Sequence, residues 1–212
     1  MNRRVLPAGV VLAGGRSRRM EGQIKALAEL NGIPLIGHVI KRLQPQVSSL
    51  ALSVEQHTEA LDRFGLRQVE DLKPGSCGPL GGLLAALEDL PAGTDWLLLA
   101  PCDAPFLPLD LGERLLECAE SLAAPGCIVR YAGELQPTFS VWHRSLSVSM
   151  RQSVFKDGMG GFKQFLARVR LPSVDWEQSA VSPFFNVNTL AELELVAGML
   201  RTEGRAAETQ LN

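Results

Sequence analysis

The sequence predicts a three-layer α/β/α sandwich built on a mostly parallel sheet. Two short segments, residues 10–13 and 96–100, are apolar at nearly every position, which is typical of strands buried on both faces of a sheet. Segments whose apolar residues recur at helical spacing alternate with strand-like segments along the chain. This alternation indicates a parallel sheet that is covered by helices on both faces.

The remaining elements follow from periodicity and from end signals. We expect strands at residues 50–54, 68–71, 128–131 and 138–142, and helices at residues 35–47, 58–64, 79–90, 109–122 and 146–155. Thr189 and Glu192 have the spacing of a capping box, in which the two side chains satisfy N–H groups at a helix start. The helix that follows is expected to bury Leu190, Leu193, Val196, Ala197 and Leu200.

The composition is typical of a globular protein: of the 212 residues, 46% are hydrophobic and 21% are charged, and the net charge is −2. We expect one domain over residues 1–202 and a disordered tail over residues 203–212. The charge argues against a nucleic-acid surface, and we expect no membrane span and no secretion signal. The cysteines (Cys77, Cys102, Cys118 and Cys127) form no C-x-x-C pair. This spacing predicts reduced thiols and a cytoplasmic protein.

Glycines and cations follow the first strand directly. Paired glycines let a backbone approach a phosphate closely, and guanidinium groups bind phosphate oxygens in a planar, bidentate way. The segment matches neither the P-loop nor the dinucleotide fingerprint, so a plain turn with solvated arginines remains the alternative. The residues that favour a phosphate site are Gly14, Gly15, Arg16, Arg18, Arg19 and Lys25.

A carboxylate follows the second apolar strand, where Asp103 stands between Pro101 and Pro105. Ligands of open α/β sheets gather outside the carboxyl ends of the strands, and a carboxylate there suits Mg²⁺. The alternative is an aspartate that caps the turn before the next helix, although Asp110 is better placed for that cap.

Other polar candidates lie at further strand and helix ends. Asp71 follows a strand and could accept from base N–H groups or ribose hydroxyls, or could simply occupy a turn. The glycine-rich segment 76–82 enters a helix, so it favours either anion binding at a helix start or close packing. Asn186 and Asn188 precede the capping box and either face the site or serve the helix start. We assign no chemistry to His38, His57 or His143.

These motifs, in this order, resemble the molybdenum cofactor guanylyltransferase family over about residues 9–196. The residues that carry the resemblance are Leu12-Ala13-Gly14-Gly15-Arg16-Ser17-Arg18-Arg19-Met20, Lys25, Leu30-Asn31-Gly32-x-Pro34-Leu35, Glu70-Asp71, Gly78-Pro79-Leu80-Gly81-Gly82, Pro101-Cys102-Asp103-x-Pro105-Phe106-Leu107-Pro108, Gln136-Pro137-Thr138 and Phe185-Asn186-Val187-Asn188-Thr189.

The resemblance implies a nucleotide-diphospho-sugar-transferase-like Rossmann fold. It also implies transfer of GMP from GTP to the terminal phosphate of molybdenum-molybdopterin, with Mg²⁺ as cofactor and with transient contacts to proteins that deliver and collect the molybdenum cofactor. Asp103 would bind Mg²⁺, and Arg19 and Lys25 would stabilise the charge of the transferring phosphates. The implied binding set is Leu12, Ala13, Gly14, Gly15, Lys25, Ser53, Asp71, Gly78, Asp103, Asn186 and Asn188.

The sequence departs from the family pattern at three positions: Glu21 replaces a glycine, Ile24 an aspartate and Ser53 an asparagine. Two alternative functions therefore stay open. The first is a related nucleotidyltransferase that uses CTP or a sugar phosphate. The second is a non-catalytic protein that binds nucleotide or cofactor, which the residues at positions 21 and 24 motivate.

Overall fold

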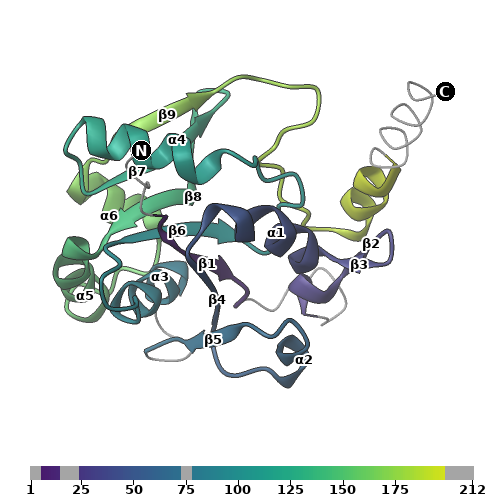
Figure 1. Cartoon of the computed structure of the whole chain (residues 1–212), viewed down its shortest axis with the longest axis horizontal. Helices are drawn as coiled ribbons and strands as arrows, with labels where there is room; N and C mark the ends of the chain where they lie inside the picture. Colours follow the sequence, from purple (N-terminus) through teal and green to yellow (C-terminus); the bar gives the residue numbers. More distant parts are fainter. Residues whose placement is uncertain (1–5, 15–23, 73–77, 199–212) are drawn as a thin grey trace.

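The computed structural model describes residues 6–14, 24–72 and 78–198. Within these residues the chain forms one seven-stranded sheet with helices on both faces and a separate two-stranded ribbon (Figure 1). The strands of the sheet are β1 (Ala8–Leu12), β4 (Ser49–Val54), β5 (Arg67–Glu70), β6 (Trp96–Pro101), β7 (Gly126–Tyr131), β8 (Glu134–His143) and β9 (Ser173–Trp176). The ribbon consists of β2 (Glu29–Leu30) and β3 (Ile33–Pro34).

The α-helices are α1 (Leu35–Leu43), α2 (Glu59–Asp62), α3 (Gly78–Glu88), α4 (Leu111–Ser121), α5 (Ser147–Phe155) and α6 (Phe162–Val169). Short 3₁₀ turns are η1 (Lys25–Leu27), η2 (Gln44–Gln46) and η3 (Arg144–Leu146). Residues 190–198 are also helical.

The sheet has the strand order β5-β4-β1-β6-β8-β7-β9. The first four of these strands run parallel to one another, whereas β8 pairs antiparallel with both β6 and β7. The carboxyl ends of β1, β4 and β6 therefore meet at one edge of the sheet. The predicted α/β/α sandwich with a mostly parallel sheet is confirmed.

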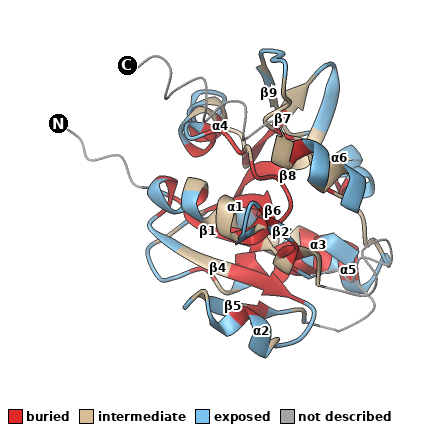
Figure 2. Cartoon of the chain, turned by 90° about the vertical axis from the view of Figure 1, so that its right-hand side faces the viewer, coloured by how far each residue is buried: buried red, intermediate tan, exposed pale blue. Residues whose placement is uncertain are grey.

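A hydrophobic core lies between each face of the sheet and the helices that cover it. On one face, α1 and α4 pack against strand residues such as Val11 and Leu98. On the other face, α3, α5 and α6 pack against Val10 and Leu99. Adjacent strand residues thus point into different cores, as the apolar runs predicted. Figure 2 shows the buried positions concentrated along the central strands.

A third, smaller apolar cluster joins the β2–β3 ribbon to the helix over residues 190–198. Leu30 and Leu35 pack there with Val187 and Val196, and all four side chains are buried. This packing fixes the segment just before the last helix against the part of the chain that follows residue 24.

Most of the expected elements are confirmed, and the differences have local causes. The helix expected at residues 35–47 ends at Leu43, where Pro45 in the following 3₁₀ turn lacks the N–H that would continue the helix. Asp110 occupies the N-cap position of α4, but its side chain makes no capping hydrogen bond to the described residues. The β2–β3 ribbon, α6 and β9 were not expected. The burial predicted for Leu190 was wrong, since this side chain is 49% exposed.

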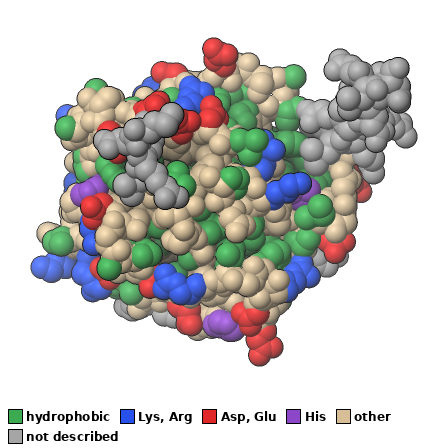
Figure 3. Space-filling view, viewed as in Figure 1, with side chains coloured by type: hydrophobic (Ala, Val, Ile, Leu, Met, Phe, Trp, Pro, Cys, Tyr) green, Lys and Arg blue, Asp and Glu red, His purple; other side chains and the backbone are tan. Residues whose placement is uncertain are grey.

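On the face of the molecule shown in Figure 3, acidic and basic side chains of the described residues lie scattered among one another. Among the described residues, no helix has the length and apolar character that crossing a bilayer requires. The expected tail over residues 203–212 and the domain limit at residue 202 lie outside the described residues.

Candidate nucleotide and metal site

Backbone hydrogen bonds join three strand ends at the carboxyl edge of the sheet. The N–H groups of Ala13 and Gly14 both donate to the carbonyl of Ser53, at 2.8 and 2.9 Å. The N–H of Cys102 donates to the carbonyl of Leu12 at 3.2 Å. Ala13 and Gly14, which follow β1, are therefore held at the end of β4, and the end of β1 lies beside the residue before Asp103.

Lys25, Asp103 and Asn188 form one side-chain cluster at this edge. The Lys25 ammonium pairs with Asp103 Oδ2 and donates to Asn188 Oδ1 at 2.7 Å. Lys25 opens η1, and Asp103 follows β6. Residues that lie 78 and 163 positions apart in the chain are thus brought together. A cation and a carboxylate share one site, as the sequence predicted.

Asp103 is buried, with 7% of its surface exposed. Its backbone carbonyl accepts from the N–H of Val187 at 2.9 Å, whereas Oδ1 is buried without a hydrogen-bond partner among the described residues. Burial raises the pKa of Asp103, and the neighbouring Lys25 charge opposes that rise. A buried carboxylate oxygen in this state needs a further donor or a cation. Asp103 therefore has the chemistry of a ligand for a divalent ion.

The segment 186–192 presents Asn188 to Lys25. Asn188 Nδ2 donates to the carbonyl of Asn186 at 2.9 Å, so its amide oxygen is left to accept from Lys25. The predicted capping box is present: Thr189 Oγ1 accepts from the N–H of Glu192 at 3.2 Å, and Glu192 Oε2 accepts from the N–H of Thr189 at 2.9 Å. The cap thus serves the helix start and leaves the Asn188 side chain for the site, while Asn186 Oδ1 is buried without a described partner.

Ser53, Asp71 and Gly82 form a second corner of the site. A Cβ built on Gly82 would stand 2.5 Å from Ser53 Oγ and 3.3 Å from Asp71 Oδ1, closer than a side chain can approach without moving its neighbours. Glycine at this position lets α3 lie against β4 and the end of β5. The close-packing alternative for this glycine is therefore confirmed. Burial, followed by the charge of Glu55, raises the pKa of Asp71.

Gly78, the first residue of α3, packs on a loop that the sequence did not reveal. Its φ is +53°, and a built Cβ would lie 2.6 Å from the carbonyl oxygen of Gly160. The same carbonyl accepts from the N–H of Leu80 at 3.1 Å. Both the backbone conformation and the contact require glycine at position 78. No sequence pattern predicts the contact between Gly78 and Gly160, because only the tertiary fold brings these two residues together.

Some predicted residues lie outside the described part of the chain. These are Gly15, Arg16, Arg18 and Arg19, together with the unusual Glu21. Among the described residues, no group of three or more His, Cys, Asp or Glu side chains could hold a metal ion. A metal at Asp103 would therefore need oxygens from substrate and water in addition, which is how Mg²⁺ is usually bound.

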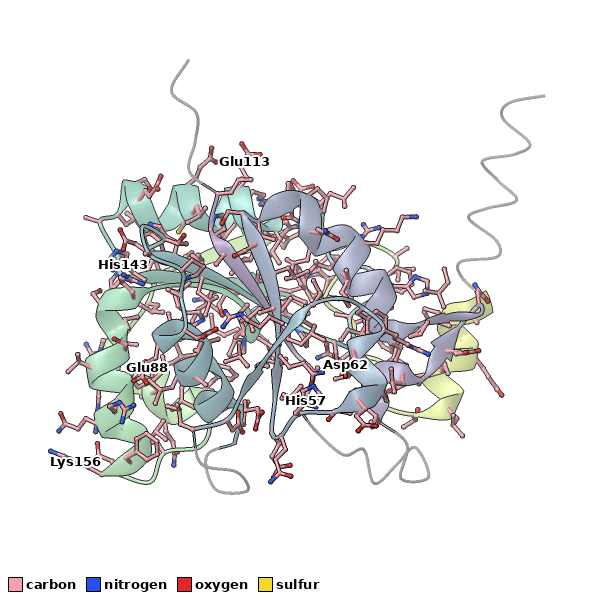
Figure 4. All side chains as sticks on the ribbon, turned by 60° about the horizontal axis from the view of Figure 1, so that its bottom comes forward. His57, Asp62, Glu88, Glu113, His143 and Lys156 are labelled. Carbon is pink, nitrogen blue, oxygen red and sulfur yellow. The ribbon has the colours of Figure 1, made fainter. Side chains whose placement is uncertain are left out.

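The histidines take no part in this cluster. His57 lies 3.1 Å from Asp62 at the surface, His143 contacts Ser145, and His38 contacts the carbonyl of Leu30 at 3.0 Å. Figure 4 shows His57 beside Asp62, with His143 in a different part of the molecule.

Residues 9–173 match the family model of the MobA-like NTP transferase domain. A molybdenum cofactor guanylyltransferase from Rhodopseudomonas palustris (strain BisB5) is 37% identical over 194 residues, which cover 89% of this chain and 92% of that protein.

Solved structures show the same fold. Molybdopterin-guanine dinucleotide biosynthesis protein A from Archaeoglobus fulgidus matches with a TM-score of 0.77 and 22% identity, over 92% of this chain and 99% of that one. Rv0371c from Mycobacterium tuberculosis H37Rv, solved in complex with manganese, matches with a TM-score of 0.66 and 17% identity, over 92% and 99% of the two chains. By the family match and the curated relative, this chain belongs to the molybdenum cofactor guanylyltransferase family, which has a MobA-like NTP transferase domain.

Proposed function

We propose that this protein transfers GMP from GTP to the terminal phosphate of molybdenum-molybdopterin, which releases pyrophosphate and forms molybdopterin guanine dinucleotide. The observation that carries the proposal is the cluster of Lys25, Asp103 and Asn188 beside the end of β1. Its chemistry suits a triphosphate and a divalent ion, and the name of the curated relative supports the choice of substrates.

GTP would lie along the ends of β1 and β4. The Leu12–Gly14 backbone would pass close to the nucleotide, and Gly15 would extend that contact. The Ser53–Asp71 corner would face the base or the ribose, because a carboxylate can accept from their N–H and O–H groups. Gly78 would hold the start of α3 against Gly160 and so set the position of that helix beside the nucleotide. Lys25, with Arg19, would bind the phosphates.

Asp103 fits a divalent ion, and we propose Mg²⁺ as that ion. Oδ1 supplies a buried oxygen without a described donor, and Asn188 Oδ1, with Asn186, offers neutral oxygens nearby. The ion, when bound with substrate oxygens, neutralises negative charge on the phosphates and orients them. Because Lys25 pairs with Oδ2, the ion would bind through Oδ1, and Lys25 would stay beside Asp103 as a cation for the phosphates.

The chain's own residues would position the reaction and balance its charge. A terminal-phosphate oxygen of the acceptor forms a bond to the α-phosphorus of GTP, and the bond between that phosphorus and the bridging oxygen breaks as pyrophosphate leaves. The attacking phosphate monoester is already ionised near neutral pH, so no protein base has to remove a proton. Lys25 and Arg19 stabilise the developing negative charge, and alignment supplies much of the acceleration.

The cysteine spacing supports a cytoplasmic setting for this reaction. Because the acceptor is itself a cofactor that other enzymes use, we also propose transient contacts with the proteins that deliver and collect it.

A survey of nucleoside triphosphates tests the proposal. Purified protein is heated with GTP, CTP, ATP or UTP and Mg²⁺, and pyrophosphate release is then measured with molybdenum-molybdopterin. GTP at a hundred times its dissociation constant should stabilise the fold by about 2.7 kcal/mol. Preferential protection by CTP would identify a related transferase, and nucleotide binding without pyrophosphate release would identify a binding protein.

A further inference from the structure

Glu192 makes one hydrogen bond more than its capping box requires. In a capping box the acidic side chain accepts from the N–H of the N-cap residue, which is Thr189 here. The same Oε2 atom also accepts from the N–H of Asn188, at 2.6 Å. Asn188 is the residue whose side chain binds Lys25. The carboxylate therefore holds the backbone of a site residue as well as the start of the helix.

From this contact we propose that Glu192 is a positioning residue of the transferase site, which fixes Asn188 so that its amide oxygen holds Lys25 beside Asp103. This inference rests on the proposed function. Glu192 itself would not touch the substrate, and its influence would pass through the backbone of Asn188.

Hydrogen bonds on both sides of Asn188 in the chain hold this residue in place. Val187 is fully buried and its N–H donates to the Asp103 carbonyl, which fixes the preceding residue. The Asn188 amide is oriented by its own bond to the carbonyl of Asn186. The backbone bond to Glu192 fixes the residue from the other side. The hydrogen bond from Asn188 contributes most to holding the pKa of Glu192 below its ordinary value, so the acceptor stays ionised.

Without the hydrogen bond between Glu192 and Asn188, Lys25 should stay in the site but point in a different direction. Lys25 would keep Asp103 as a partner but lose the fixed amide oxygen that sets its direction. A misplacement of roughly 1 Å can slow a reaction by about 10²-fold. We therefore expect Glu192→Ala to lower kcat by about 10- to 100-fold and to change KM for GTP much less.

Thr189→Ala is the matched control, because it removes the other half of the same capping box and leaves the Glu192–Asn188 bond in place. The two variants of the full chain should lose similar thermal stability, whereas Thr189→Ala should keep kcat within about threefold of the unmodified protein. Glu192→Gln should also stay within about threefold, because glutamine can fill the same capping position. Parallel losses of kcat in Glu192→Ala and Thr189→Ala would overturn the inference.

A double-mutant cycle tests whether the effect passes through Asn188. In an Asn188→Ala background, Glu192→Ala should lower kcat by less than about twofold further, since coupled residues are not additive. A full additional loss would contradict the proposed route.

The side-chain amide NMR signal of Asn188, assigned with Asn188→Asp, provides a readout that needs no turnover. It should move in Glu192→Ala and remain in place in Thr189→Ala, and an unmoved signal in both variants would overturn the positioning role. Absence of pyrophosphate release from the unmodified protein would overturn the proposed function alone.

Discussion

The two corners of the candidate site are built on different physical principles. The Lys25–Asp103–Asn188 corner is held by an ion pair and a charge-assisted hydrogen bond between side chains from three distant segments. The Ser53–Asp71–Gly82 corner is held by close packing of α3 on two strand ends, where there is no room for a Cβ.

This difference separates two tasks that a nucleotidyltransferase must perform. A cation and a carboxylate in one cluster can bind phosphates and a metal ion side by side, so the first corner suits the reacting end of the nucleotide. A tightly packed corner with one partly buried carboxylate rejects ligands that do not fit its shape or that leave the carboxylate without a hydrogen bond. The second corner therefore suits the base or the ribose.

The largest effect is expected from Asp103→Asn. Asparagine keeps the side-chain shape and can still accept from Lys25, so the fold should survive, but the charge that would hold the metal is lost. Pyrophosphate release should fall by about 10³-fold. Turnover and circular dichroism measure the two outcomes, and near-normal turnover in a folded variant would remove Asp103 from the metal site.

Lys25→Met should lower turnover by about 10²-fold, since the cation that would stabilise the phosphates is missing. The same change should strengthen the binding of Mn²⁺ alone by about tenfold, equivalent to about 1.4 kcal/mol, because Asp103 no longer has a competing ammonium. Titration followed by electron paramagnetic resonance, without nucleotide, measures this gain. A weaker affinity for Mn²⁺ would contradict this competition between Lys25 and the ion at Asp103.

At the packed corner, Gly82→Ala should act on binding rather than on chemistry. The new methyl group would displace Ser53 or Asp71 and cost about 1–3 kcal/mol of stability. KM for GTP should rise by about tenfold while kcat stays within about threefold. Steady-state kinetics distinguish the two, and a loss confined to kcat would show that the two corners do not divide the work in this way.

The smallest effect concerns pH. Burial and the Glu55 charge raise the pKa of Asp71 above 3.8, so the folded state favours the protonated carboxyl. The associated stability is present below the unfolded pKa and is lost as pH rises through the folded pKa. Asp71→Asn should therefore be slightly more stable than the unmodified protein at neutral pH. Its GTP affinity should be weaker than that of the unmodified protein at neutral pH. As pH falls through the folded pKa of Asp71, the affinity of the unmodified protein should decline and that of the variant should not. Thermal melts and binding titrations measure the stability and the affinity.

The sequence predicted the frame of the fold because its signals were local. The apolar run at residues 10–13 indicated β1, and the capping box at Thr189 marked the last helix. Some local signals were also overlooked. Asn31-Gly32 is a typical two-residue hairpin turn with positive φ at both positions, and Phe162, Phe165 and Val169 have helical spacing in α6.

The sequence predicted that a cation and a carboxylate share one site, but it could not provide the direct contacts between distant side chains. The contact between Lys25 and Asp103 depends on how the segment after the first loop returns along the sheet edge, and neighbouring residues do not encode that path. The contact of Gly78 with Gly160 likewise depends on the placement of the loop before α6. Residue types indicated the chemistry of the site, whereas the partners of each residue required the fold.

The most direct test of a shared triphosphate and metal site is pulsed electron paramagnetic resonance of the protein with Mn²⁺ and GTP. With the aspartate carboxyl carbons labelled with ¹³C, we predict couplings from the ion to the GTP phosphorus nuclei and to a carboxyl carbon in the unmodified protein. Only the carbon coupling should be lost in Asp103→Asn, because Mn²⁺ also binds the phosphates without the protein. An unchanged carbon coupling in Asp103→Asn, at full occupancy of both ligands, would contradict the assignment of Asp103 to the metal that the phosphates share.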